Sequence, residues 1–110
     1  MKMTDDQVKD ALENLPDWSF VAGKLFKEFR YRGFRSAMAF VNRVADLAIA
    51  AGHHPDIEIH SDRVLLSLTT HDEGGVTDQD ISMARRIESV AEPAGGSRGS
   101  ARPGYGARPG

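Results

Sequence analysis

The chain has 110 residues and a mass of 12.0 kDa, which is room for one domain with a single modest core. Its net charge of −2 gives the whole chain no strong electrostatic signal for nucleic acid, and the lack of cysteine excludes disulfides and thiolate chemistry. The N-terminal sequence is acidic and amphipathic, and no apolar run approaches the roughly 18 residues that a membrane span needs. We therefore expect a cytoplasmic protein without a membrane segment.

The composition changes sharply at Pro93. Residues 93–110 contain six glycines, three prolines and three arginines, and Tyr105 is their only large apolar side chain. Such a segment cannot bury enough surface to offset the entropy of ordering, so we expect a disordered tail after a domain that spans 1–92. The three arginines leave a weak contact with nucleic acid open, although a solubilising tail is the simpler interpretation.

The first part of the domain predicts a helix and then a hairpin. Thr4 and Gln7 have the spacing of a capping box, and the apolar residues after them recur at helical intervals, which predicts a helix over 4–15. Apolar and polar side chains then alternate on the far side of an Ala-Gly-Lys turn. This pattern predicts strands at 18–21 and 25–31 that pair with each other.

A long amphipathic helix is expected to begin at Phe34, because apolar residues recur every three or four positions. Gly52 is well placed to end this helix in a left-handed conformation. Two strands follow, near 57–60 and 63–70, joined by a tight Ser-Asp turn.

The last helix is expected to begin at Thr77, with the threonine hydroxyl accepting the backbone amide of Asp80. The element order is then α-β-β-α-β-β-α. Two hairpins separated by a helix predict an α+β fold with a four-stranded, largely antiparallel sheet and helices packed on one face. This architecture alone does not indicate a function.

Three of the four histidines lie where elements are expected to end. His53 and His54 precede Pro55 in the short loop after the long helix, and His71 follows the last strand. Side chains at adjoining ends can meet at one edge of a layer, and imidazole can both give and accept a proton near neutral pH. The three histidines are therefore candidates for acid–base catalysis, while His60, inside a strand, is expected on the surface.

Spacing alone leaves two other interpretations of the histidines open. They could belong to solvated connecting loops with no shared site. Three imidazoles could also hold a catalytic zinc ion. Adjacent histidines on a loop rarely point the same way, however, and the chain has no His-x-x-x-His pair, so we expect no metal.

A set of motif residues extends over about residues 4–92. Its members are Leu15, Trp18, Phe29, Phe34, Phe40, Val44, Ala45, His53, His54, Pro55, Val64, Leu66, Leu68, Thr70, His71, Gly74, Gly75, Thr77, Asp80 and Ala84. The paired histidines, the threonine–histidine pair sixteen residues further on and the aspartate after it together make the pattern specific. In the order and spacing of these motifs the chain resembles the pterin-4a-carbinolamine dehydratases.

The resemblance implies a hydro-lyase that converts a 4a-hydroxytetrahydropterin into quinonoid dihydropterin in pterin recycling and uses no cofactor of its own. By position, His53 and His71 match the family's acid–base histidines, and His54 matches the histidine that mainly holds the pterin. The residues that fall beside the substrate pocket are Pro55, Asp56 and Thr70. The resemblance also implies a homodimer or a homotetramer.

Two positions depart from the pattern of active family members. Ile49 stands where an acidic residue is usual, and Ser61 stands where an aromatic residue is usual. An alternative therefore stays open, in which the chain is a dehydratase-like binding or assembly module without catalysis. The family resemblance extends to a dimerisation cofactor of a transcription factor and to assembly factors for the carboxysomal carbon-fixing enzyme.

Overall fold

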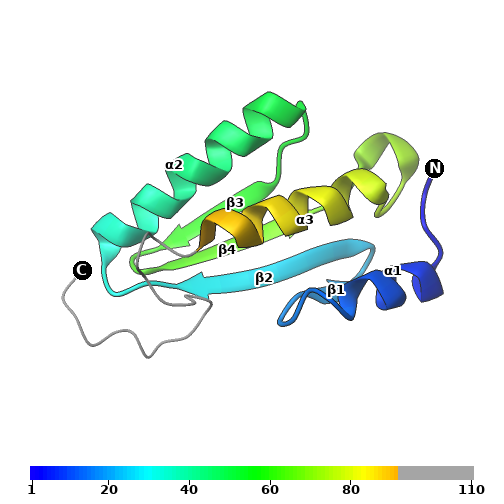
Figure 1. The fold of residues 1–110 in the computed structure, drawn as a ribbon, viewed down its shortest axis with the longest axis horizontal. Helices are drawn as coiled ribbons and strands as arrows, with labels where there is room; N and C mark the ends of the chain where they lie inside the picture. Colours follow the sequence, from blue (N-terminus) through cyan, green and yellow to red (C-terminus); the bar gives the residue numbers. More distant parts are fainter. Residues whose placement is uncertain (92–110) are drawn as a thin grey trace.

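The structure is a computed structural model, and it describes residues 1–91. Seven helices and strands follow in the predicted order, with one short 3-10 helix at His71–Glu73 (Figure 1). They are α1 (Asp5–Leu12), β1 (Ser19–Val21), β2 (Lys24–Arg30), α2 (Phe34–Ala51), β3 (Asp56–His60), β4 (Arg63–Leu68) and α3 (Asp78–Ala91). The predicted tail, residues 93–110, lies outside the described residues. No helix within 1–91 combines the length and the apolar character that crossing a membrane requires.

The four strands form one antiparallel sheet in the order β1-β2-β4-β3, so both predicted hairpins form and join through β2 and β4. Leu25 lies opposite Leu68 and Phe29 lies opposite Val64, and all four side chains are buried. Because alternate residues of a strand point to opposite faces, these side chains share one face of the sheet. Helices α2 and α3 lie side by side over that face (Figure 1). The predicted α+β fold is confirmed.

Aromatic packing holds α2 against β2. The ring centroid of Phe40, on α2, lies 4.7 Å from that of Phe29 and 5.2 Å from that of Tyr31, and all three rings are buried. Truncating such a ring to alanine typically costs about 3–5 kcal/mol, a large share of the stability of a small domain. The helix that leads into the histidine loop is therefore firmly placed on the sheet.

Helix α3 is held to the sheet by polar contacts as well as by packing. The buried ammonium of Lys27 lies 2.5 Å from the Glu88 carboxylate, which also accepts a hydrogen bond of 2.9 Å from the Trp18 indole. At the end of the helix, the Tyr31 hydroxyl donates to the carbonyl of Ala91. These contacts fix the position of the helix whose first turn carries Asp80.

Helix α1 begins as predicted and ends earlier than predicted. Thr4 and Gln7 form the capping box, with hydrogen bonds of 2.8 and 3.1 Å. The helix stops at Leu12 instead of residue 15, because the amides after it turn back on carbonyls only three residues earlier. Leu15 is still buried, so its apolar spacing reflects contact with the core and does not extend the helix.

Candidate active site

The C-terminal end of α2 positions His53. Gly52 has φ of 66°, and its amide donates to the carbonyl of Ile49 over 3.3 Å. The amide of His53 donates to the carbonyl of Ala48 over 3.2 Å, which completes a Schellman motif. The predicted left-handed end at Gly52 is confirmed, and His53 is the residue that directly follows it.

The N-terminal turn of α3 positions Asp80. Its side chain is completely buried, and its Oδ2 accepts the amide of Thr77 at 2.9 Å and the hydroxyl of Thr70 at 2.8 Å. Our prediction that the Thr77 hydroxyl accepts the amide of Asp80 was wrong, since it accepts the amide of Gln79 at 3.2 Å. The helix start is thus held mainly by the aspartate carboxylate, which is also favoured there by the helix dipole.

The direction of the hydrogen bonds in this cluster follows from what each group can donate. An ionised carboxylate only accepts, so the hydroxyl of Thr70 gives its one proton to Asp80. The hydroxyl of Thr77, 2.8 Å from that of Thr70, must then be the donor between the two threonines. Both hydroxyl protons are therefore donated within this cluster. The hydrogen bonds to Oδ2 hold the Asp80 carboxylate in one orientation and leave its Oδ1 for another partner.

That second oxygen contacts His53. Nε2 of His53 lies 2.5 Å from Oδ1 of Asp80, and the histidine side chain is 14% exposed whereas the aspartate is fully covered. Because the carboxylate accepts, Nε2 carries the proton, and a neutral His53 has its lone pair on Nδ1. Nδ1 makes no hydrogen bond to any other residue of the described range 1–91. His53 can therefore take up or release a proton at Nδ1 while Asp80 holds the ring.

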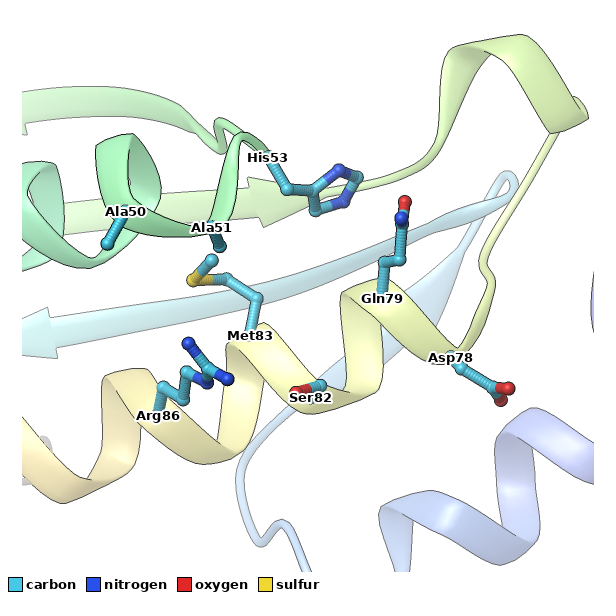
Figure 2. A pocket seen from close by; sticks show the side chains of 8 residues that line it. All are labelled: Ala50, Ala51, His53, Asp78, Gln79, Ser82, Met83 and Arg86. Carbon is cyan, nitrogen blue, oxygen red and sulfur yellow. The ribbon is translucent and has the colours of Figure 1, made fainter.

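A cleft of about 410 Å³ lies beside His53, between the end of α2 and the first turns of α3. Two of its lining residues, Ala50 and Ala51, are the last two residues of α2. Figure 2 shows His53 and the side chain of Gln79 on one side of Met83 and the guanidinium of Arg86 on the other. The lining residues are Ala50, Ala51, His53, Asp78, Gln79, Ser82, Met83 and Arg86.

The structure brings together some of the residues predicted for the site. Thr70 is joined to His53 through Asp80, and His71 follows Thr70 directly, with an exposed side chain at the start of the 3-10 helix. His54 and Asp56 are exposed beside the histidine loop, and Pro55 is half-buried. Apart from His53, none of the predicted site residues lines the cleft, so their convergence around a ligand remains a prediction.

The two departures from the family pattern lie away from the His53–Asp80 contact. The side chain of Ile49 is 71% exposed. Ser61, with φ of 60°, forms the turn at the end of β3 that is opposite to the histidine loop. The carboxylate partner of His53 is supplied by Asp80, from another helix.

The prediction from sequence missed Asp80 as a site residue. The signal was present, since Asp80 belongs to the motif that carries the family resemblance. An aspartate in the first turn of a helix is ordinarily explained as a cap, however, and here the same carboxylate both caps α3 and holds His53.

Within residues 1–91, no group of three or more histidine and acidic side chains is placed to hold a metal ion.

Comparisons with known proteins agree with these motifs. The family model described as pterin 4 alpha carbinolamine dehydratase matches residues 1–90. The chain belongs to this family. A protein of Thermomicrobium roseum, provisionally named as a pterin-4-alpha-carbinolamine dehydratase, is 44% identical over 90 residues, which cover 82% of this chain and 97% of the relative. A second relative, from Gloeobacter violaceus, carries the same provisional name and is 48% identical over 90 residues, covering 78% of this chain and 98% of the relative.

Two solved structures share the dehydratase fold. The crystal structure of a transcriptional coactivator/pterin dehydratase from Brucella melitensis superposes with a TM-score of 0.80 at 32% identity, covering 83% of this chain and 99% of that one. A pterin dehydratase-like protein, identified as a RuBisCO assembly factor in the alpha-carboxysome, superposes with a TM-score of 0.56 at 24% identity, covering 67% and 86% of the two chains. The second likeness shows the common fold alone.

Proposed function

We propose that this chain is a 4a-hydroxytetrahydropterin dehydratase with His53 as an acid–base residue. The observation that carries the proposal is the 2.5 Å contact between Nε2 of His53 and the buried Asp80 carboxylate, beside an open cleft, in a chain of the dehydratase family. The carboxylate is itself fixed by hydrogen bonds from Thr70 and Thr77. It therefore holds the His53 ring in an orientation suited to proton transfer at Nδ1.

The reaction removes water and transfers no electrons to or from the protein. The bond between C4a and the hydroxyl oxygen breaks, the proton on N5 is lost, and a double bond forms between C4a and N5. One group must give a proton to the departing hydroxyl, and another must accept the proton from N5. Two histidine side chains can fill these roles, because an imidazole can both give and accept a proton, and such positioned transfer accelerates reactions by about 10²–10⁴-fold.

We assign these two roles to His53 and His71. His53 exchanges its proton at Nδ1, since Nε2 is engaged with Asp80. His71 lies one residue after Thr70, which shares the Asp80 carboxylate, so the backbone ties both histidines to one buried group. Asp80 and Thr70 act as positioning residues because they reach the substrate only through His53.

The remaining predicted residues are assigned to substrate binding. His54 would hold the pterin ring, with Pro55 and Asp56 beside it. Pro55 has a fixed φ and limits the conformations of the residue before it, which keeps His54 out of the helix. His54 and Pro55 form the short segment that connects the Schellman motif to β3, and Asp56 is the first residue of that strand.

We also propose a cytoplasmic homo-oligomer that acts in pterin recycling. In the described chain the sheet has two edge strands, β1 and β3, and their outer backbone groups pair with no other strand. Small proteins commonly cover such edges, and a second copy can do so across a two-fold axis. The five-residue β3 offers a longer edge than the three-residue β1.

The proposal is tested by measuring how fast quinonoid dihydropterin forms from 4a-hydroxytetrahydropterin generated in the assay. The full chain is expected to accelerate the spontaneous reaction, and His53→Ala is expected to remove most of that acceleration. His60→Ala is the matched control, because the His60 imidazole is 55% exposed and, within residues 1–91, its ring nitrogen contacts only Glu58. A rate with the wild-type chain that equals the spontaneous rate would contradict the proposal.

One observation favours the second candidate, a binding or assembly module without catalysis. Two large apolar side chains of α2 are exposed, Phe34 at 59% and Ile49 at 71%. Such side chains mark a surface that contacts another protein when they belong to a contiguous apolar patch. If the dehydration assay shows no acceleration, a role of this kind becomes the better account of the fold.

A further inference from the structure

Arg86 is a charged residue of the cleft that the proposed reaction does not use. It lines the cleft together with Gln79, Ser82 and Met83, which are seven, four and three residues earlier on α3. Residues with this spacing share one face of a helix. A helix rises about 1.5 Å per residue, so Arg86 lies about 10 Å along α3 from Gln79, the lining residue beside His53.

The guanidinium of Arg86 has no ion-pair or hydrogen-bond partner within residues 1–91. No acidic residue stands three or four positions away from it on α3, where a helical ion pair would form. Asp78 is the only acidic residue that lines the cleft, and Figure 2 shows its carboxylate pointing away from both His53 and Arg86. The far end of the cleft therefore presents a positive charge that is not neutralised.

If the proposed function holds, the chemistry of the pterin ring gives this charge a role in substrate recognition. The atom that loses its proton in the dehydration, N5, is bonded to C6, the carbon that carries the side chain of natural pterins. When N5 lies at His53, the C6 substituent leaves the ring beside His53 as well. The open cleft along α3 offers that substituent a path toward Arg86.

We propose that this cleft binds a pterin whose C6 substituent ends in an oxyanion, and that Arg86 recognises the oxyanion. The planar guanidinium donates paired hydrogen bonds to phosphate and carboxylate oxygens alike. The hydroxyl of Ser82, one turn before Arg86, adds a further donor on the same face. Arg86 is thus a specificity-determining residue that lies outside the reacting centre.

The test compares the equilibrium affinity of the full chain for three stable dihydropterins by calorimetry. The probes are 6-hydroxymethyl-7,8-dihydropterin, its phosphate ester, and 7,8-dihydropterin-6-carboxylate. A charged hydrogen bond from the guanidinium predicts that the phosphate ester binds at least about tenfold more tightly than the alcohol, which corresponds to about 1.4 kcal/mol. The carboxylate probe distinguishes a phosphate-specific site from a site for any oxyanion, because only the latter also prefers the carboxylate to the alcohol.

In Arg86→Ala, the affinities for the phosphate ester and for the alcohol are expected to differ by no more than about twofold. Arg86→Lys keeps the positive charge and is expected to keep part of the preference for the ester. Arg85→Ala is the matched control: Arg85 is the neighbouring exposed arginine of α3, its removal changes the net charge equally, and it does not line the cleft. The control is expected to keep the wild-type ratio.

Equal affinity of the wild-type chain for the alcohol and both anions overturns this inference, as does a preference that Arg85→Ala and Arg86→Ala reduce equally. The proposed function is judged separately, from the turnover of a neutral 4a-hydroxytetrahydropterin by the same preparation. Turnover of the neutral substrate without a preference for anions leaves the dehydratase assignment in place and removes only the role of Arg86.

Discussion

His53 and Asp80 come from the facing ends of two different helices and meet at 2.5 Å between Nε2 and Oδ1. The histidine directly follows Gly52, the residue that ends α2, and the aspartate lies in the first turn of α3. The end of α2 is fixed by backbone hydrogen bonds and the start of α3 mainly by the Asp80 carboxylate, so the contact depends on how α2 and α3 pack on the sheet.

Thr70→Val should weaken the support of Asp80. The change removes the hydroxyl that donates to Oδ2 at 2.8 Å and keeps the shape of the side chain. Losing one partner of a buried charged group should lower the free energy of unfolding by about 1–3 kcal/mol and lower the dehydration rate.

Thr69→Val is the matched control for this change. The Thr69 hydroxyl donates to the carbonyl of Gly23, at the turn of the first hairpin and not to Asp80. Urea unfolding and initial rates measured on both variants should show loss of stability in each, but loss of activity only in Thr70→Val. Equal effects on activity would contradict the role given to Thr70.

Gly52→Ala should destabilise the chain, because Gly52 has a φ of 66° that a residue with a Cβ adopts only at a cost of about 1–2 kcal/mol. No atom lies within 4 Å of the place where a Cβ would be, so the cost is conformational and not steric. Gly52→Asn should lose less, since asparagine tolerates this region. Thermal unfolding of the two variants tests the order, and an alanine variant as stable as the wild type would contradict it.

The fold was predictable from local signals. The capping box at Thr4, the left-handed end at Gly52 and the alternation of side chains in β2 and β4 each act over a few residues. The end of α1 was missed, because burial of Leu15 after a tight turn mimics another helical turn. The contact between His53 and Asp80 could not be found by spacing, since it joins residues 27 positions apart through the packing of two helices.

His54→Ala and His71→Ala should have different kinetic effects. If His54 holds the pterin ring, its loss should mainly raise KM, whereas the loss of His71 as an acid–base residue should lower kcat by about 10²–10⁴-fold. Both side chains are exposed, so both variants should fold normally. Steady-state kinetics separates the two constants, and an unchanged kcat in His71→Ala would remove that residue from the mechanism.

The uncovered edges of the sheet predict self-association. Sedimentation velocity of the full chain at tens of micromolar should show a dimer or a tetramer, because strand edges with unpaired backbone groups favour pairing. Replacing Ile57 by proline removes a backbone donor in the middle of β3, and it should weaken the assembly if this edge is used. A 12.0 kDa monomer at that concentration would contradict the prediction.

The claim that Asp80 acts in catalysis through His53 is tested most directly by a double-mutant cycle on the dehydration rate. It uses His53→Ala, Asp80→Asn and the double variant, with stability measured in parallel to separate loss of activity from unfolding. If the two residues act as a unit, each single change should lower kcat by about tenfold or more, and the double variant should be no slower than His53→Ala. Rate losses that multiply in the double variant would show that Asp80 contributes independently of His53 and would contradict this account.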